Sequence, residues 1–311
     1  MGVATAIGRK AIRITDRIVD TTVLIVILLL IVIGCYAVWD SGQVYQAANA
    51  ARYEVYRPTA ANEGKSFAEL QAINPDVFGW LTVYGTHIDY PVVQGPDNMT
   101  YINANAERQY SLSGAIFLDQ YSSRDFSDFS SIVYGHHMEK NAMFGELGNF
   151  ADKNYFDARE YGALYYDGQE HGLEFFAFVH ADAYDGAVFR AKIPRDEQQA
   201  YLDMLLTMAL HARDLPVTTD DRIVLLSTCS DASTNGRDLL IAKITGEPRE
   251  NPFRPDEKGG GRNILTVDGL PGLWARFPAW VKWILILLPL VLPVAVTLTI
   301  KKKRRSRRAR S

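Results

Sequence analysis

Two long apolar runs near the ends of the chain limit its fold most strongly. Residues 21–39 carry no charged side chain, and neither do residues 283–300. As helices they would reach about 28 Å and about 27 Å, close to the hydrocarbon thickness of a bilayer. Pro289 and Pro293 would kink the second run. The sequence therefore predicts a transmembrane helix over 21–39 and a second one over 283–300.

Positive charge outside both runs predicts their orientation. Residues 9–17 hold four Lys or Arg side chains, and residues 301–311 hold eight. Such clusters stay on the cytoplasmic side of a membrane, so segments 1–20 and 301–311 are expected inside the cell and the long middle segment outside. A cleaved signal peptide is the alternative for the first run, but no small-x-small cleavage site follows it. We expect a two-pass protein of the cell membrane.

The middle segment is acidic. Residues 40–275 hold 19 Lys and Arg against 34 Asp and Glu, a net charge of about −15. This charge argues against nucleic acid as a partner. The basic tail at 301–311 directly follows an apolar run, so we expect it to contact anionic membrane lipids.

The chain has two cysteines, Cys35 inside the first apolar run and Cys229 in the acidic segment. They are not expected to form a disulfide. Zinc sites built on paired cysteines are excluded by the count, and we expect no metal and no organic cofactor. A single thiol outside the cell is either buried and inert or a reactive nucleophile.

Short apolar runs between turn residues predict a mainly β domain over 66–250. It follows a helical stalk within 40–65 and precedes a Gly- and Pro-rich linker over 251–282. Ser66 and Glu69 form a capping-box pattern for a short helix that ends near Asn74-Pro75, and an apolar stripe predicts a helix over 196–212. The expected strands are 80–83, 88–90, 91–94, 115–118, 131–134, 173–180, 222–229 and 239–245.

Cys229 ends an apolar strand and precedes a polar, turn-prone segment. A nucleophile presented at a strand end fits this position, and so does an inert core thiol. Arg237 begins the next predicted strand, where antiparallel pairing would bring its charge near the thiol; an ordinary surface ion pair is the alternative. His136 and His137 follow the strand that ends at Tyr134 and offer an acid or base, or a loop feature or weak metal contact.

These motifs together resemble the sortase family. Leu225-Leu226-Ser227-Thr228-Cys229 resembles the Thr-Leu-x-Thr-Cys signature, and Gly135-His136 resembles the motif of the catalytic histidine. Further matches point to class B and cover about residues 66–247. They are Asn74-Pro75-Asp76-Val77-Phe78-Gly79-Trp80, Ile88-Asp89-Tyr90-Pro91-Val92-Val93-Gln94, Gly114-Ala115-Ile116-Phe117-Leu118-Asp119 and Tyr134-Gly135-His136-His137-Met138 followed by Met143-Phe144-Gly145.

The resemblance implies an eight-stranded sortase β-barrel decorated with helices, flanked here by the two predicted membrane helices. It implies a cysteine transpeptidase, classed with the thiol proteases, of a Gram-positive bacterium. Cys229 would cut the sorting signal of a secreted surface protein through a thioester and pass the acyl fragment to an amine of a peptidoglycan precursor or a pilin. His136 would act as acid and base, Arg237 would bind the oxyanion, and Thr228 and Ser227 would bind substrate.

Three departures from the family pattern bear on these expectations. Leu225 replaces the first Thr of the signature and is expected to point away from the chemistry, and His137 is an alternative to His136. The second predicted span is unusual for class B and more familiar in class C pilin polymerases, although the chain has no Asp-Pro pair of the class C lid. Pilus assembly therefore remains open.

Two other functions compete. One is a cysteine peptidase or amidase that uses water, against which Arg237 stands where an Asn or Asp would be expected. The other is a membrane-tethered binding protein whose Cys229 is inert.

Overall fold

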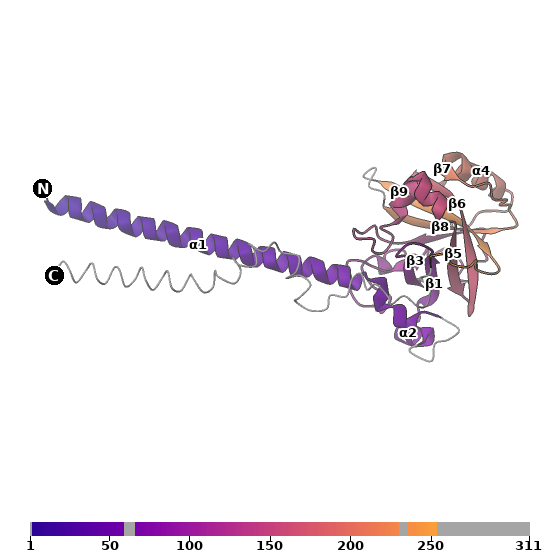
Figure 1. Cartoon of the computed structure of the whole chain (residues 1–311), viewed down its shortest axis with the longest axis horizontal. Coiled ribbons are helices and arrows are strands. Elements are labelled where there is room, and N and C mark those ends of the chain that lie inside the picture. The colour runs from indigo at the N-terminus through magenta and orange to yellow at the C-terminus, as the bar shows by residue number, and fades with distance from the viewer. Residues whose placement is uncertain (1, 59–65, 230–234, 254–311) are drawn as a thin grey trace. The chain divides into compact units, whose positions relative to one another are not determined.

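The computed structural model describes residues 2–58, 66–229 and 235–253 (Figure 1). The second predicted span at 283–300, the tail at 301–311 and nearly all of the predicted linker at 251–282 lie outside these residues. So does the segment 230–234, which directly follows Cys229.

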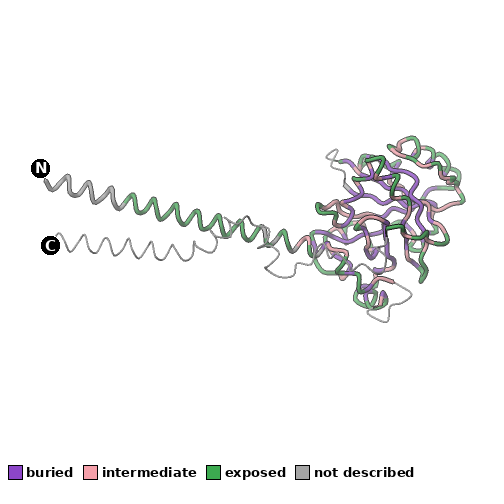
Figure 2. The backbone as a smooth tube through the Cα atoms, in the orientation of Figure 1, coloured by how far each residue is buried: buried purple, intermediate pink, exposed green. Residues whose placement is uncertain are grey.

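The first apolar run lies in a single helix, α1 (Gly2–Ala47). Its part Thr15–Ala37 is long and apolar enough to cross a membrane, and among the described residues no other helix is. Its apolar side chains are exposed, as the green tube in Figure 2 indicates. This agrees with the first predicted span by length and composition.

The predicted helical stalk ends earlier than expected. Helix α1 stops at Ala47, and two short 3₁₀ helices follow, Ala50–Arg52 and Glu54–Tyr56. The Asn49 side chain accepts a hydrogen bond from the Ala51 N–H at 3.0 Å and so caps the first of them. The helical pattern ends here because Tyr53 and Tyr56 turn into the core of the domain.

The described residues of the domain form nine strands: β1 (Val77–Val83), β2 (Asp89–Val93), β3 (Ile116–Leu118), β4 (Ser130–Tyr134), β5 (Tyr161–Tyr166), β6 (Gln169–Asp182), β7 (Ala209–Ala212), β8 (Arg222–Cys229) and β9 (Gly236–Thr245). Their order is β5-β1-β2-β3-β4-β8-β9-β6-β7, and β5 also pairs with β6. This pairing closes eight strands into a barrel and leaves β7 attached to β6 outside the closure. The predicted eight-stranded barrel is confirmed.

The remaining helices are short: α2 (Phe67–Ile73), α3 (Lys153–Ala158), α4 (Gln198–Met208) and the 3₁₀ helices Thr100–Ile102 and Leu147–Ala151. Helix α2 ends at Ile73 with Asn74 as its C-cap, close to the end predicted near Asn74-Pro75, but the Ser66 side chain makes no capping hydrogen bond. The helix predicted over 196–212 ends at Met208, because the residues after it pair with β6 as β7. Figure 1 shows α4 beside β6 and β7.

Strands β8 and β9 bury both of their faces. Alternate residues, among them Val224, Leu226 and Leu240, join the interior cluster that fills the barrel. The residues between them, Leu225 and Leu239, lie in a second cluster under α4, with Tyr201, Leu202 and Leu205 of that helix. We call the second group the α4 cluster.

Candidate active site

Strand register brings three of the predicted site residues to one end of the barrel. Strands β4 and β8 run parallel with Tyr134 opposite Ser227, and the Gly135 N–H donates to the Ser227 carbonyl at 3.1 Å. His136 and Cys229 each lie two residues beyond that pair in the same direction. On the other side of β8, antiparallel pairing sets Cys229 opposite Arg237.

The alternation of the strands separates these residues from their neighbours. Cys229 occupies the alternate positions of β8 that include Leu225 and Ser227, and Arg237 occupies those of β9 that include Leu239. These positions belong to the face of the barrel that carries the α4 cluster. Leu225 thus shares the face of Cys229 instead of pointing to the other one, but it is fully buried under α4.

Backbone contacts fix the His136 ring. Its Nε2 lies 2.8 Å from the Ile102 carbonyl oxygen, which holds the ring against the 3₁₀ helix Thr100–Ile102. Gly114, at φ 60°, lies beneath the ring, and a Cβ there would be 3.1 Å from the His136 Cδ2 and 2.6 Å from the Ile102 oxygen. Only glycine can adopt this positive φ and also leave the space free where a Cβ would stand.

Gly135 and His137 complete the Tyr-Gly-His-His motif in different ways. A Cβ on Gly135 would approach the Ile116 Cδ1 to 2.5 Å, so the position requires glycine. His137 pairs through its backbone with Met143, and its Nδ1 is buried. These contacts give His137 a place in the loop behind His136, whose ring lies at the end of β4.

A polar network that the sequence reasoning did not assign lies beside the site. The Asp119 carboxylate accepts hydrogen bonds from the Tyr134 hydroxyl at 3.3 Å, the Asn98 amide at 2.7 Å and the Tyr121 N–H at 2.8 Å. Burial raises the pKa of Tyr134 and the Asp119 charge raises it further, while the positive charge of Arg237 opposes them. Asp119 directly follows β3, and this position of a carboxylate at a strand end is the sequence feature that could have identified it as a site residue.

The two predicted substrate-binding residues are both buried, with exposed fractions of 1% for Ser227 and 2% for Thr228. Neither hydroxyl has a hydrogen-bond partner among the described residues. Thr228 pairs with Asp238 at positions that face the barrel interior, and the Asp238 carboxylate lies 2.7 Å from the His180 Nδ1. The position of Ser227 therefore lies on the same face of β8 as that of Cys229, and the position of Thr228 lies on the opposite face.

Within the described part of the chain, no three His, Cys, Asp or Glu side chains lie close enough together to hold a metal ion. The site consists instead of a histidine ring, a guanidinium and the end of the strand that carries the thiol. Such a set can support acyl transfer through a thiol nucleophile.

Curated relatives of the chain are sortases. It is 30% identical over 207 residues to sortase B of Staphylococcus aureus, a match that covers 65% of this chain and 81% of that protein. It is 32% identical over 184 residues to sortase B of Listeria monocytogenes, a match that covers 57% and 72%. No protein-family model matches the chain.

Solved structures give the same result. The sortase B from the Type II pilus of Streptococcus pneumoniae is 48% identical, with a TM-score of 0.51 over 58% of this chain and 98% of that one. A Staphylococcus aureus sortase B-substrate complex is 29% identical, with a TM-score of 0.55 over 66% and 93%. A sortase B complexed with triglycine is 26% identical, with a TM-score of 0.56 over 67% and 99%. The chain belongs to the sortase family of cysteine transpeptidases and is most similar to class B.

Proposed function

We propose that the chain is a membrane-anchored sortase in which Cys229 is the nucleophile, His136 exchanges protons and Arg237 binds the oxyanion. One observation carries this assignment. The register of β4, β8 and β9 sets Cys229 opposite Arg237 and at the same strand end as His136, in a chain of the sortase family.

The reaction proceeds in two halves. The Cys229 sulfur attacks the carbonyl carbon of the scissile peptide bond, and the Arg237 guanidinium stabilises the negative charge on the carbonyl oxygen. The C–N bond breaks, His136 gives its proton to the leaving amine, and an acyl thioester remains on Cys229. An incoming amine then attacks the thioester and gives a proton to His136, so a new amide forms and the thiolate leaves.

The ring of His136 has a defined orientation for these transfers. A backbone carbonyl can only accept a hydrogen bond, so the contact with Ile102 requires a proton on Nε2. Nδ1 is then the nitrogen that exchanges protons in this conformation. The contact also restrains the ring, so the imidazole is already oriented for proton transfer.

The substrate is a sorting-signal peptide of a secreted protein, and the acceptor is an amine. Support comes from the staphylococcal structure with bound substrate and from the sortase B structure with triglycine. A pilin amine is the acceptor we favour over a peptidoglycan amine, because the sortase from a Type II pilus shares 48% of its residues with this chain.

The membrane arrangement is part of the proposal. Residues 21–39 anchor the chain, residues 66–250 form the catalytic domain outside the cell, and residues 283–300 form a second span whose basic tail at 301–311 contacts membrane lipids. Support comes from the apolar helix Thr15–Ala37 and from the flanking positive charge. Protease digestion of intact cells and of inverted vesicles, with tags at both termini, tests this layout; a terminus cut in intact cells would refute it.

The catalytic proposal is tested with the full chain in detergent and a library of fluorogenic pentapeptides, with and without triglycine. We expect cleavage and a triglycine-linked product with the wild-type chain, and neither with Cys229→Ala. Cleavage without a linked product would favour a hydrolase that uses water. No reaction, together with a Cys229 that resists iodoacetamide, would favour the binding protein.

A further inference from the structure

The segment that follows the anchoring helix is built into the domain. Ala48 is fully buried, and Tyr53 and Tyr56 belong to the interior cluster. Arg52 forms an ion pair with Glu107 and donates a hydrogen bond to the Gln109 side-chain oxygen at 3.0 Å. Arg57 lies 2.9 Å from the Asp89 carboxylate at the start of β2. Residues 48–57, which we call the docking segment, are therefore held against the barrel along their length.

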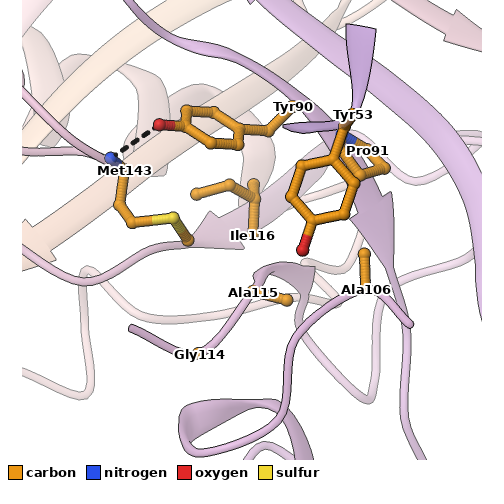
Figure 3. A pocket seen from close by; sticks show the side chains of 8 residues that line it. All are labelled: Tyr53, Tyr90, Pro91, Ala106, Gly114, Ala115, Ile116 and Met143. Atoms are coloured by element: carbon orange, nitrogen blue, oxygen red, sulfur yellow. Dashed lines mark hydrogen bonds between the residues drawn. The ribbon is translucent and has the colours of Figure 1, made fainter. Parts of the chain in front are cut away.

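Tyr90 of β2 joins the docking segment to the loop at 135–146, which carries His136 and which we call the histidine loop. Its hydroxyl donates to the Ala48 carbonyl at 2.8 Å and accepts from the Met143 N–H at 3.0 Å. The phenol is 2% exposed, and burial raises its pKa, so it stays protonated and makes both bonds at once. Figure 3 shows the hydroxyl pointing at the Met143 nitrogen, with Tyr53 nearby on the far side of Ile116.

The same residues line a small, partly open cavity with room for about one water molecule. Tyr53 comes from the docking segment, Tyr90 from β2, Gly114 from beneath the His136 ring and Met143 from the histidine loop. These elements line one cavity, so a shift of the docking segment would disturb both Gly114, which lies beneath the His136 ring, and Met143.

The histidine loop needs such support because its backbone is strained. Lys140, Asn141 and Met143 adopt φ values of 59°, 60° and 51°, which cost free energy for residues other than glycine. The Phe144 N–H donates to the His136 carbonyl at 3.0 Å, and Met143 pairs with His137. A displacement of Met143 is therefore passed directly to the backbone of His136.

The last turn of α1 touches the same loop. The Tyr45 hydroxyl donates to the Glu139 carboxylate at 3.3 Å, and the Lys140 ammonium lies 4.0 Å from the centre of the Tyr45 ring. The loop thus contacts the end of the anchoring helix as well as the docking segment through Tyr90.

We propose that Tyr90 is a positioning residue that couples the docking segment to the histidine loop, so that the chain next to the anchor holds His136 in place for proton transfer. The inference rests on the proposed role of His136. Tyr90 is buried, and its effect is transmitted through the Met143 N–H.

The test compares Tyr90→Phe with wild type in the full chain, with the fluorogenic pentapeptide that the library selects and triglycine as acceptor. We expect kcat to fall about tenfold, a fraction of what acid–base catalysis supplies, with KM changed less than about twofold. The rate at which iodoacetamide alkylates Cys229 stays at the wild-type value. Tyr166→Phe, which alters a buried tyrosine at the end of β5, serves as the matched control and keeps the wild-type kcat.

A second pair of variants addresses the other end of the contact. Ala48→Leu overfills a buried site and displaces the docking segment, whereas Ala51→Leu adds the same side chain at an exposed position. We expect Ala48→Leu to lower kcat as Tyr90→Phe does, and the double variant to be no slower than either single variant. Ala51→Leu keeps the wild-type rate.

Two results would overturn the inference. If Tyr90→Phe and Ala48→Leu both keep the wild-type kcat below their unfolding temperatures, the contact only stabilises the fold. If the loss of kcat in the double variant is the product of the two single losses, the two residues act separately. His136→Ala separates this failure from failure of the proposed function. If that variant still turns over peptide, the catalytic assignment itself is wrong; if it is inactive while Tyr90→Phe keeps the wild-type kcat, only the coupling is wrong.

Discussion

The two faces of β8 and β9 differ in how they are enclosed. The interior cluster is surrounded by eight paired strands, whereas the α4 cluster is covered by one helix of 11 residues with neighbouring loops. The positions of Cys229 and Arg237 belong to the second face. The barrel interior and the proposed site therefore use alternate residues of the same strands, and mutations can separate their effects.

The largest effect is expected from the site face. Cys229→Ala removes the proposed nucleophile, so we expect cleavage of the selected pentapeptide to fall more than about 10³-fold. The midpoint of thermal unfolding should stay near the wild-type value. If unfolding shifts as strongly as activity, Cys229 supports the fold and the two faces are not separate in function.

Leu226 lies in the interior cluster and Leu225 in the α4 cluster, so substitutions of these two adjacent leucines compare the clusters. Leu226→Ala should lower the free energy of unfolding by about 3–5 kcal/mol, and Leu225→Ala by about 2–3 kcal/mol, because α4 can settle into the space left beneath it. Urea unfolding followed by tryptophan fluorescence measures both. Equal losses would mean that α4 is held as rigidly as the barrel wall.

Arg237→Lys keeps the charge but loses the planar guanidinium with its several donors. We expect kcat to fall about 10²-fold, as for the loss of one oxyanion donor, while Cys229 still reacts with iodoacetamide. Activity close to wild type would show that charge alone suffices at this position.

The smallest effect concerns the end of the interior cluster, where the His171 ring stacks on Tyr166 with the ring centres 4.1 Å apart. Burial, helped by the Arg222 charge, lowers the pKa of His171 from its ordinary value of 6.5, so the folded state favours the neutral ring. The resulting stabilisation is complete above that ordinary value and is lost as the pH falls below it.

We therefore expect wild type to lose slightly more stability between about pH 7 and pH 5 than His171→Gln does. Urea unfolding at both values measures the difference between the two slopes, which is insensitive to the stacking lost at every pH. Parallel slopes would mean that His171 protonates equally in the folded and unfolded chain.

The sequence predicts the structure correctly where the local residue pattern favours the same element as the pairing of strands in the barrel. The apolar run of β8 ends at Cys229 as predicted, and Arg237 faces it across an antiparallel pair. The catalytic roles of these residues stay predictions. The runs predicted at 88–90 and 91–94 lie together around β2, which continues through Pro91.

Other elements depend on distant partners and could not be predicted from local pattern. Residues 209–212 continue the apolar stripe of α4 but pair with β6, since tertiary contacts outweigh helix propensity. The strand β5 was missed although Asp167-Gly168, at φ 49° and 76°, is a hairpin signal. The local pattern places Tyr53 in the predicted helical stalk, and its burial depends on contacts with the barrel that the pattern does not contain.

The parallel pairing of β4 with β8 sets the time at which the site can exist. Residues 135–221 separate the two strands in sequence, and closing so long a loop makes their pairing a late, non-local step of folding. During synthesis the chain emerges from its N-terminus, so His136 is present long before Cys229. In the proposed arrangement, a chain still in transit across the membrane therefore cannot cut its neighbours, because the proposed site forms only when folding has joined the two halves of the barrel.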